Sequence, residues 1–377
     1  PSWIHAADRQ PPSAGPDRPP MLTTLFHVPM RIPWGDGSLP LFGFGILLAL
    51  VAFGGAAAVV VTAMRHGWRM AASILGGPLL LAAALVVFVL PALDDGQGVP
   101  IRGYGLMLLV AAAAGIRLSI VRGRKMGFDA DTILALGTEM FVAGIVGARL
   151  FYVIQYHDRF FPPGRSLMAS LLDAVNIPAG GLVVFGSLPT AAVAAWWFAR
   201  RRGLPLLRLA DCIAPGMLVG LALGRLGCFL NGCCFGGPCD LPWAVRFPPE
   251  SPPWIDQVER GLLPPPSADG SLQWSLPVHP AQLYAAIDAA LLAVLAIAFT
   301  PVARRAGEVF ALVLTLHPVS RILLEAIRID EPPALCTPLS ISQLVSVLLL
   351  FLATVLWWWI ASSGGLCSAV GDHGEKR

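Results

Sequence analysis

Nine stretches of the chain are apolar over about 20 residues each, the length that an α-helix needs to cross the hydrocarbon core of a bilayer. Glycines, prolines and charged residues separate these stretches. The pattern predicts an all-α, polytopic membrane protein with about nine transmembrane helices. The predicted spans are residues 40–63, 72–92, 101–121, 132–155, 179–199, 207–230, 281–300, 308–327 and 339–361.

The composition agrees with a membrane location. Of the 377 residues, 56% are hydrophobic and only 13% are charged, whereas about a quarter of the residues in a soluble domain are charged. The mean hydropathy is +0.69. The net charge of +3 comes from clustered arginines, a pattern that argues against a nucleic-acid surface. We therefore expect a membrane-embedded protein without a nucleic-acid partner.

Basic residues follow alternate predicted spans, and this asymmetry predicts the orientation of the chain. Cytoplasmic loops of membrane proteins carry an excess of Lys and Arg. The rule places the N-terminus outside and the C-terminus in the cytoplasm, which requires an odd number of spans. The clusters are Arg65 with Arg69, Arg122 with Arg124 and Lys125, Arg200–Arg202 with Arg208, and Arg304 with Arg305.

The predicted spans divide the chain into consecutive parts. The first is a polar, partly disordered N-terminal extension, and its lack of an initiator Met leaves Met21 or Met30 as the expected natural start. Two helices then precede a core of seven, whose longest loop carries prolines and tryptophans and is expected to form a cap. The parts are 1–38 for the extension, 39–93 for the two leading helices, 99–361 for the core with its outer loop 231–280, and 362–377 for a cytoplasmic tail.

Arginines inside the predicted spans are the strongest functional signal. A charge at membrane depth costs about 2.5–3.5 kcal/mol on insertion scales, so it is rarely kept without a partner or a task. Arg225 and Arg149 lie near the outer ends of their spans, while Arg321, Glu325 and Arg328 share one helix face. Guanidinium groups bind phosphate in a forked geometry. The pattern predicts a phospholipid headgroup site, with a structural ion pair and snorkelling side chains as alternatives.

Small and polar residues accompany Arg225. Gly224 and Gly227 allow a lipid or another backbone to approach closely. Asn231 offers both a donor and an acceptor, for a substrate or for the backbone at the helix end.

A second polar group opens the seventh predicted span. His279, Gln282 and Tyr284 lie there at the depth expected for Arg225. An imidazole titrates near neutrality, so His279 is a candidate general base, although a histidine at a helix start is more often a hydrogen-bonding residue.

Four cysteines fall within twelve positions after the sixth span. They lack a second pair at zinc spacing and have no histidine among them, so we expect no metal there. On an outer face a disulfide is favoured. We expect one from Cys239 to Cys233 or Cys234, with Cys228 as the fourth member of the group.

Taken in order, these pieces resemble the prolipoprotein diacylglyceryl transferase family. The family signature reads Gly-Arg-x-Gly-Asn-Phe-x-Asn-x-Glu followed by a glycine. Residues 99–361 cover seven family helices, and the leading spans at 40–92 look like the longer, planctomycete-type branch. The signature is matched at Gly224, Arg225, Gly227, Phe229, Asn231 and Gly236, and further resemblance lies at 102–107, 147–152, 180–182, 211–215, 279–284, 321–328 and 339–343.

The resemblance implies a function. Such enzymes transfer the diacylglyceryl group of phosphatidylglycerol to the lipobox cysteine of a prolipoprotein signal peptide, in the bacterial inner membrane and facing the outer leaflet. No metal or cofactor is implied. The implied catalytic residues are Arg225, Arg321, His279 and Tyr104, and the implied substrate-binding residues are Arg149, Asn231, Gly224, Gly227, Gln282, Tyr284, Glu325 and Arg328.

Three positions depart from the family pattern. Phe185 stands where the family has a histidine, Cys228 replaces the first asparagine of the signature, and Cys233 replaces its glutamate. Phenylalanine cannot accept a proton. The proton acceptor is then His279, Tyr104, Glu325 or water. The alternative function is a diverged phospholipid-binding membrane protein that kept the headgroup site and lost the base.

Overall fold

The computed structural model describes residues 24–34, 37–162, 164–176, 180–263, 273–328, 337 and 339–362. Most of the predicted N-terminal extension, nearly all of the predicted tail and the middle of the predicted cap loop lie outside these residues. The chain forms two compact units. The first unit takes the described residues up to Leu106 together with Leu230–Gly232 and those of Phe247–Ser275, and the second takes the remainder.

The first unit contains short strands that the apolar pattern did not predict. Strand β1 (Thr24–Val28) pairs antiparallel with β4 (Val99–Arg102). Strand β2 (Arg31–Trp34) pairs antiparallel with β3 (Gly37–Pro40). These strands have only four or five residues each, too few for an alternating pattern to stand out from the sequence.

The helices of the first unit include the two predicted leading spans. They are α1 (Ile46–His66), α2 (Trp68–Ala84) continued by the π-helix η2 (Leu85–Val89) and by α3 (Leu90–Ala92), and α10 (Pro252–Glu259).

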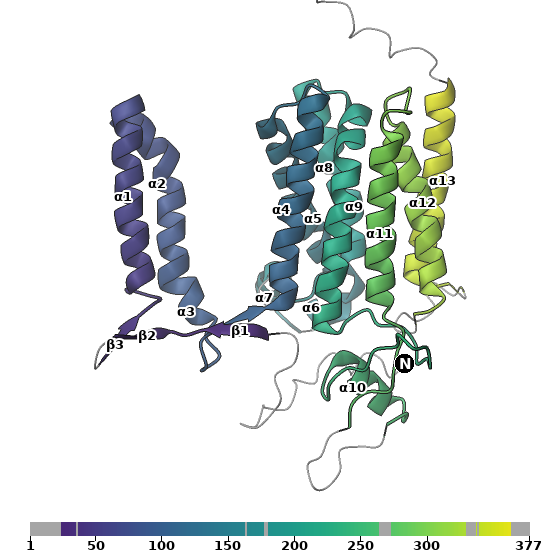
Figure 1. Cartoon of the computed structure of the whole chain (residues 1–377), viewed down its shortest axis with the longest axis horizontal. Coiled ribbons are helices and arrows are strands. Elements are labelled where there is room, and N and C mark those ends of the chain that lie inside the picture. The colour runs from purple at the N-terminus through teal and green to yellow at the C-terminus, as the bar shows by residue number, and fades with distance from the viewer. Residues whose placement is uncertain are drawn as a thin grey trace, which may run out of the picture. The chain divides into compact units, whose positions relative to one another are not determined.

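The second unit is a bundle of long helices, which lie side by side in Figure 1. Helix α4 (Gly103–Lys125) starts in the first unit and continues in the second. The other helices are α5 (Ala130–Gln155), α6 (His157–Phe160), α7 (Leu167–Val175), α8 (Val184–Arg202), α9 (Leu206–Asn231), α11 (Ala281–Phe299), α12 (Glu308–Glu325) and α13 (Ile341–Ser362).

Every predicted span coincides with a helix, and in the described part of the chain seven candidates are long and apolar enough to cross a membrane. These are α1, the run Trp68–Ala92, α4, α5, α9, α11 and α13. The protein is therefore mostly helical and polytopic. Helices α8 and α12 are not among the seven, so the count of nine spans and the orientation stay predictions.

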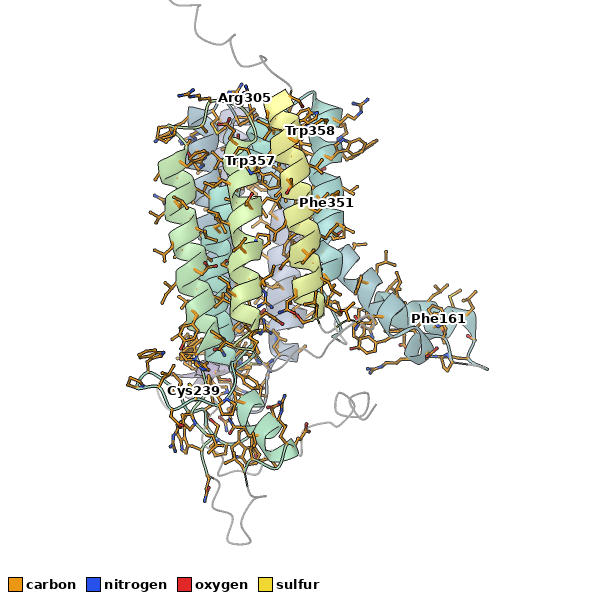
Figure 2. The ribbon with its side chains drawn as sticks, turned by 90° about the vertical axis from the view of Figure 1, so that its right-hand side faces the viewer. Phe161, Cys239, Arg305, Phe351, Trp357 and Trp358 are labelled. Carbon is orange, nitrogen blue, oxygen red and sulfur yellow. The ribbon has the colours of Figure 1, made fainter. Side chains whose placement is uncertain are left out.

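The surface of the bundle agrees with a lipid environment. Large apolar side chains are exposed along the helices, such as Phe351 at 64% and Trp358 at 69% in α13. Figure 2 shows these two on the outside of the bundle, with Arg305 at one end and Cys239 at the other. An apolar surface of this extent is stable in hydrocarbon and would aggregate in water.

Glycines allow α5 and α8 to pack closely. A Cβ atom on Gly147 would lie 2.5 Å from the carbonyl oxygen of Gly186, and one on Gly186 would lie 2.2 Å from that of Gly147. Both distances are below van der Waals contact, so neither position accepts a side chain without a shift of backbone. Small residues at helix crossings are typical of membrane bundles.

Arg122 supplies hydrogen bonds to backbone that Pro215 leaves without a donor. Pro215 lies inside α9 and has no N–H, so the carbonyl of Asp211, four residues earlier, loses its helical partner. Arg122 is buried, and its Nη2 donates to that oxygen at 3.0 Å. Its Nε donates to the Cys212 carbonyl at 3.2 Å and its Nη1 to Thr300 Oγ1 at 3.0 Å. In a membrane helix no water replaces these bonds.

Asp211 joins α9 to the beginning of α12. Its Oδ2 accepts a hydrogen bond from the Gly307 amide at 2.6 Å, and its Oδ1 accepts one from the Phe310 amide at 2.8 Å. The first N–H groups of a helix lack partners within the helix, and a carboxylate there also complements the helix dipole. Asp211 therefore fixes the start of the helix that carries Arg321.

Replacing Arg122 by glutamine is expected to lower the free energy of unfolding by about 2–5 kcal/mol, because two buried carbonyls lose charged donors. Thermal unfolding of the purified protein in detergent measures this change. Arg124 lies two residues later in α4 and is exposed, so Arg124→Gln is the matched control. Equal unfolding temperatures for the two variants would contradict the role given to Arg122.

Candidate active site

The loop that follows α9 brings three parts of the second unit together. The Gly236 amide donates to the His279 carbonyl at 3.0 Å, and the His279 amide donates to the Gly237 carbonyl at 3.0 Å. The Gly237 amide also donates to the Ile327 carbonyl at 3.0 Å. Through these bonds the end of α9, the segment before α11 and the end of α12 meet at one place.

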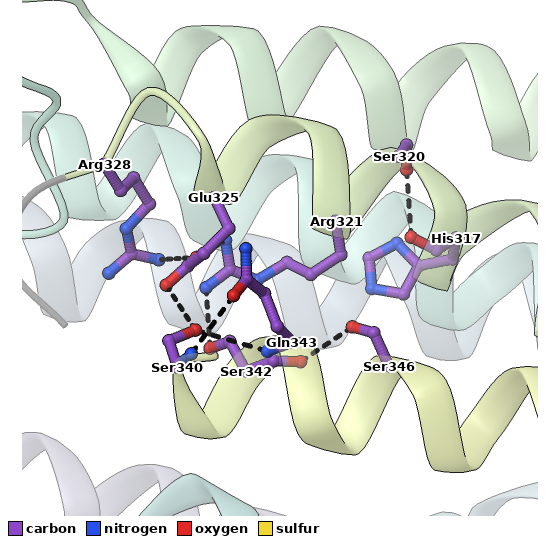
Figure 3. A network of polar contacts seen from close by, with 9 residues as sticks. All are labelled: His317, Ser320, Arg321, Glu325, Arg328, Ser340, Ser342, Gln343 and Ser346. Carbon is purple, nitrogen blue, oxygen red and sulfur yellow. Dashed lines mark hydrogen bonds and ion pairs between the residues drawn. The ribbon is translucent and has the colours of Figure 1, made fainter. Parts of the chain in front are cut away.

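An ion-pair network occupies the end of α12 and is drawn in Figure 3. Arg321 Nη1 lies 2.6 Å from Glu325 Oε2, and Arg328 Nη1 lies 3.9 Å from the same oxygen. Arg321 Nη2 also donates to Ser342 Oγ at 2.8 Å. The Glu325 side chain is 4% exposed, so its charge is buried together with its partners. The spacing of four predicted the Arg321–Glu325 pair, whereas α12 ends at Glu325 and Arg328 reaches the carboxylate from the segment beyond the helix.

The start of α13 anchors the same carboxylate. Ser340 and Gln343 form a capping box: the Gln343 amide donates to Ser340 Oγ at 3.2 Å, and the Ser340 amide donates to Gln343 Oε1 at 3.1 Å. Ser340 Oγ then donates to Glu325 Oε1 at 2.9 Å. Glu325 is thus held by contacts to two helices and positions both arginines (Figure 3).

Arg225 differs from the paired arginines. It is partly buried in α9, and among the described residues no hydrogen bond or ion pair engages its guanidinium group. Its charge acts on Cys234 together with that of Arg328, and on His317 together with that of Arg321. Arg225, Arg321 and Arg328 therefore lie in one charge environment with the carboxylates of Glu325 and Asp288, and the three arginines leave an excess of positive charge.

His317 is a partly buried histidine of α12 that was not among the residues predicted from the sequence. It precedes Arg321 by one helical turn, and the two lie along the same stretch of α12 in Figure 3. Its Nδ1 is buried and has no hydrogen-bond partner among the described residues. The spacing of four from Arg321 was the available signal. His317 was not predicted because it lies in an apolar segment and is followed by Pro318.

Arg149 is held by backbone. It is 6% exposed, and its Nε and Nη2 donate to the carbonyls of Ala174 at 2.8 Å and Asp173 at 2.7 Å, in the last turn of α7. Its Nη1 donates to the carbonyls of Gly180 and, at 3.0 Å, Gly181. A cation at a helix C-terminus is favourable. These contacts favour an architectural role, and the expected contact with substrate stays a prediction.

Gly181 shows why this segment needs glycine. Its φ of 80° lies in the left-handed region, and a Cβ atom would lie 2.3 Å from the Tyr152 ring. Phe185 follows near the start of α8 and is partly buried. The segment therefore has a defined backbone even though the histidine of the family pattern is absent.

His279, Tyr284 and Gln282 lie together, as predicted. His279 Nδ1 is 3.4 Å from the Tyr284 hydroxyl, which accepts a hydrogen bond from Trp243 Nε1 at 2.7 Å. Gln282 is fully buried, and its Nε2 donates to the Cys233 carbonyl at 2.8 Å. These contacts hold the loop after α9, and the expected catalytic role of His279 stays a prediction.

The remaining predicted residues are placed as follows. A Cβ atom on Gly224 would meet open space, and Gly227 is buried. Asn231 is the last residue of α9, and no hydrogen bond of its side chain is found within the described residues. Tyr104 belongs to the first unit and is 36% exposed. Their roles at the site stay predictions.

The cysteines differ from the expected arrangement. None of the four forms a disulfide within the described residues, and the structure groups Cys228 with Cys233 and Cys234, leaving Cys239 outside the group. The predicted bond to Cys239 is therefore absent, and the Cys239 amide donates to the Pro277 carbonyl at 3.0 Å. Hydrogen bonds from the other two thiols lower the pKa of the Cys234 thiol against the effect of burial, and nearby arginine charges act in the same direction.

Comparisons with known proteins identify the family. The family described as prolipoprotein diacylglyceryl transferase matches residues 92–359. A phosphatidylglycerol–prolipoprotein diacylglyceryl transferase of Rhodopirellula baltica is 38% identical over 254 residues, which are 64% of this chain and 50% of that protein. Proteins of the same name from Clostridium tetani and Corynebacterium diphtheriae are 28% and 27% identical, each over 68% of this chain and over 92% and 87% of their own lengths.

The family match takes in every helix that carries the arginine network, Arg225 and His317. The chain spans half the length of the Rhodopirellula relative. With the helical bundle and the signature residues of α9 in place, the chain belongs to the prolipoprotein diacylglyceryl transferase family.

Proposed function

We propose that this protein transfers the diacylglyceryl group of phosphatidylglycerol to the lipobox cysteine of prolipoproteins. The observation that carries the proposal is Arg225, a partly buried arginine without a hydrogen bond or ion pair among the described residues. It acts in the same charge environment as the Arg321–Glu325–Arg328 network. The relatives named above carry this activity in their names.

The excess positive charge suits the reaction. The sulfur of the lipobox cysteine bonds to the glyceryl carbon that carries the phosphate ester. The bond from this carbon to the ester oxygen breaks, and glycerol phosphate leaves with the electron pair. The phosphate thereby gains a second negative charge. Three guanidinium groups against the carboxylates of Glu325 and Asp288 leave one positive charge to stabilise it, and fixed charges of this kind need no rearrangement during the reaction.

The thiol must lose its proton, because the thiolate is the nucleophile. We assign the proton acceptor to His317. Its Nδ1 has no hydrogen-bond partner among the described residues, and it interacts electrostatically with Asp288 and with both Arg225 and Arg321. The ring of His279 contacts the Tyr284 hydroxyl, which supports a positioning role for that residue. Glu325 is committed to its arginine partners.

The proposed location is the bacterial inner membrane, with the site facing the outer leaflet and nine spans in all. The arginine clusters that follow alternate helices support this orientation. Phosphatidylglycerol is then delivered from the bilayer, between helices whose apolar side chains are exposed to the lipid. The signal peptide meets the site from the outer side.

The proposal is tested with purified protein, phosphatidylglycerol vesicles and a synthetic lipobox peptide. Intact mass spectrometry of the peptide is expected to show the gain of one diacylglyceryl group. Vesicles of phosphatidylcholine alone and a peptide with serine in place of the lipobox cysteine are the controls.

The absence of a mass gain from a folded protein that binds phosphatidylglycerol would contradict the proposal. It would favour a diverged lipid-binding protein. Phe185→His then becomes the informative variant, because it restores the histidine of the family pattern. If that variant transfers the diacylglyceryl group, the unmodified protein lacks only the group that accepts the thiol proton.

A further inference from the structure

Three thiols at the end of α9 form a cluster that the proposed transfer does not use. The Sγ atoms of Cys228, Cys233 and Cys234 all lie within 4.8 Å of one another. Each residue is partly buried, and none of the three forms a disulfide within the described residues; the Cys233 thiol donates to the Cys228 carbonyl at 3.7 Å. Two of the three occupy signature positions where the family has asparagine and glutamate.

The backbone at the helix end produces this cluster. The Cys233 amide donates to the Cys228 carbonyl at 3.2 Å, which turns the chain back onto the last turn of α9. Cys234 has a φ of 60°, in the left-handed region that residues with a side chain rarely adopt. Gln282 holds the Cys233 carbonyl from α11 at 2.8 Å. Strained backbone kept in place by neighbouring hydrogen bonds is a feature of functional sites.

The distances between the three sulfur atoms favour a bound cation over a disulfide. A disulfide joins two sulfurs at about 2.05 Å and leaves the third without a partner. Three thiolates around one metal at about 2.3 Å lie about 3.8–4.0 Å apart in tetrahedral or trigonal geometry. A group of three sulfurs within 4.8 Å therefore approaches the arrangement around a metal with little movement, and it uses all three residues.

We propose that Cys228, Cys233 and Cys234 bind one soft, thiophilic cation, Cu(I) or Zn(II). Soft thiolate ligands select these ions over harder cations. Binding converts three thiols to thiolates and releases three protons to solvent, with no change of oxidation state. Three thiolates and the cation carry a net charge of −2 or −1.

This site does not depend on the proposed transfer, so binding is measured directly. The full-length protein in detergent is loaded with Cu(I) under anaerobic conditions or with Zn(II). Bound metal is then counted by mass spectrometry, and affinity is measured by competition with a chelator. One equivalent per chain is expected. Cys234→Ser is expected to weaken binding by at least about 100-fold, whereas Cys239→Ser, outside the cluster, retains it.

A second measurement uses the unmodified protein, so it tests the proposal even if the cysteine variants do not fold. Bound metal should protect the three cluster thiols from N-ethylmaleimide while Cys239 stays reactive, as read by peptide mass spectrometry. X-ray absorption distinguishes three sulfur ligands around Cu(I) from three sulfurs and a lighter ligand around Zn(II). Equal loss of metal in Cys239→Ser, the absence of protection, or a disulfide among the cluster thiols in the isolated protein would overturn the proposal.

Discussion

Replacing Arg225 by alanine is expected to lower the rate of diacylglyceryl transfer by at least about 100-fold, the typical effect of removing one group that stabilises a developing negative charge. Arg225 has no hydrogen bond or ion pair among the described residues, so its removal leaves no protein group unsatisfied. The thermal stability should therefore change little. The mass-spectrometric transfer assay and thermal unfolding together measure both quantities.

Two further variants sharpen this test. Arg225→Lys keeps the charge but loses the forked geometry, so it should recover only part of the activity. Arg246 lies in the loop after α9 and is exposed, which makes Arg246→Ala the matched control for loss of one positive charge. An Arg225→Ala protein that folds and transfers the diacylglyceryl group at the normal rate would contradict the role given to Arg225 and with it the main support for the proposed function.

Replacing His317 by glutamine is expected to lower the rate by about 10²–10⁴-fold, the usual contribution of a general base. Glutamine keeps a polar group of similar size but accepts no proton at neutral pH. In the unmodified protein the rate should fall as the pH falls, because a protonated imidazole cannot take the thiol proton. In His317→Gln the fall of the rate with falling pH should disappear. Initial rates measured from acidic to neutral pH test both expectations.

The candidate bases give different outcomes in this experiment. If His279 were the acceptor, His279→Gln would remove the pH dependence and His317→Gln would keep it. His157 is exposed in α6, so His157→Gln controls for the loss of a histidine. An unchanged pH profile in His317→Gln would assign the proton transfer to another group.

The helices were predictable because the length of an apolar segment is a local property. Each predicted span overlaps a helix, for example 132–155 with α5 (Ala130–Gln155) and 207–230 with α9 (Leu206–Asn231). The four short strands were missed because each has only four or five residues, too few for an alternating pattern to stand out. The Arg321–Glu325 pair followed from helical spacing alone, whereas Arg328 lies beyond the end of α12 and not on the predicted shared helix face.

Partners across the bundle could not be read from spacing. Arg149 and Arg225 are equivalent in the sequence, since each is a cation near the end of an apolar span. The structure binds Arg149 to backbone carbonyls of α7 and of the Gly180–Gly181 segment. Arg122, taken from the sequence only as a marker of orientation, supplies donors to α9.

The sequence by itself determined that the chain is embedded in a membrane, where its long helices run, and which family it belongs to. The reason is that hydrocarbon thickness and the satisfaction of backbone hydrogen bonds act on each segment separately. Tertiary structure decided that Arg225 is partly buried without a hydrogen bond or ion pair in the described part of the chain, that His317 shares its charge environment, and that Cys228 joins Cys233 and Cys234 rather than Cys239. These outcomes depend on which helices pack together and on how the loop after α9 is hydrogen-bonded, and local spacing encodes neither.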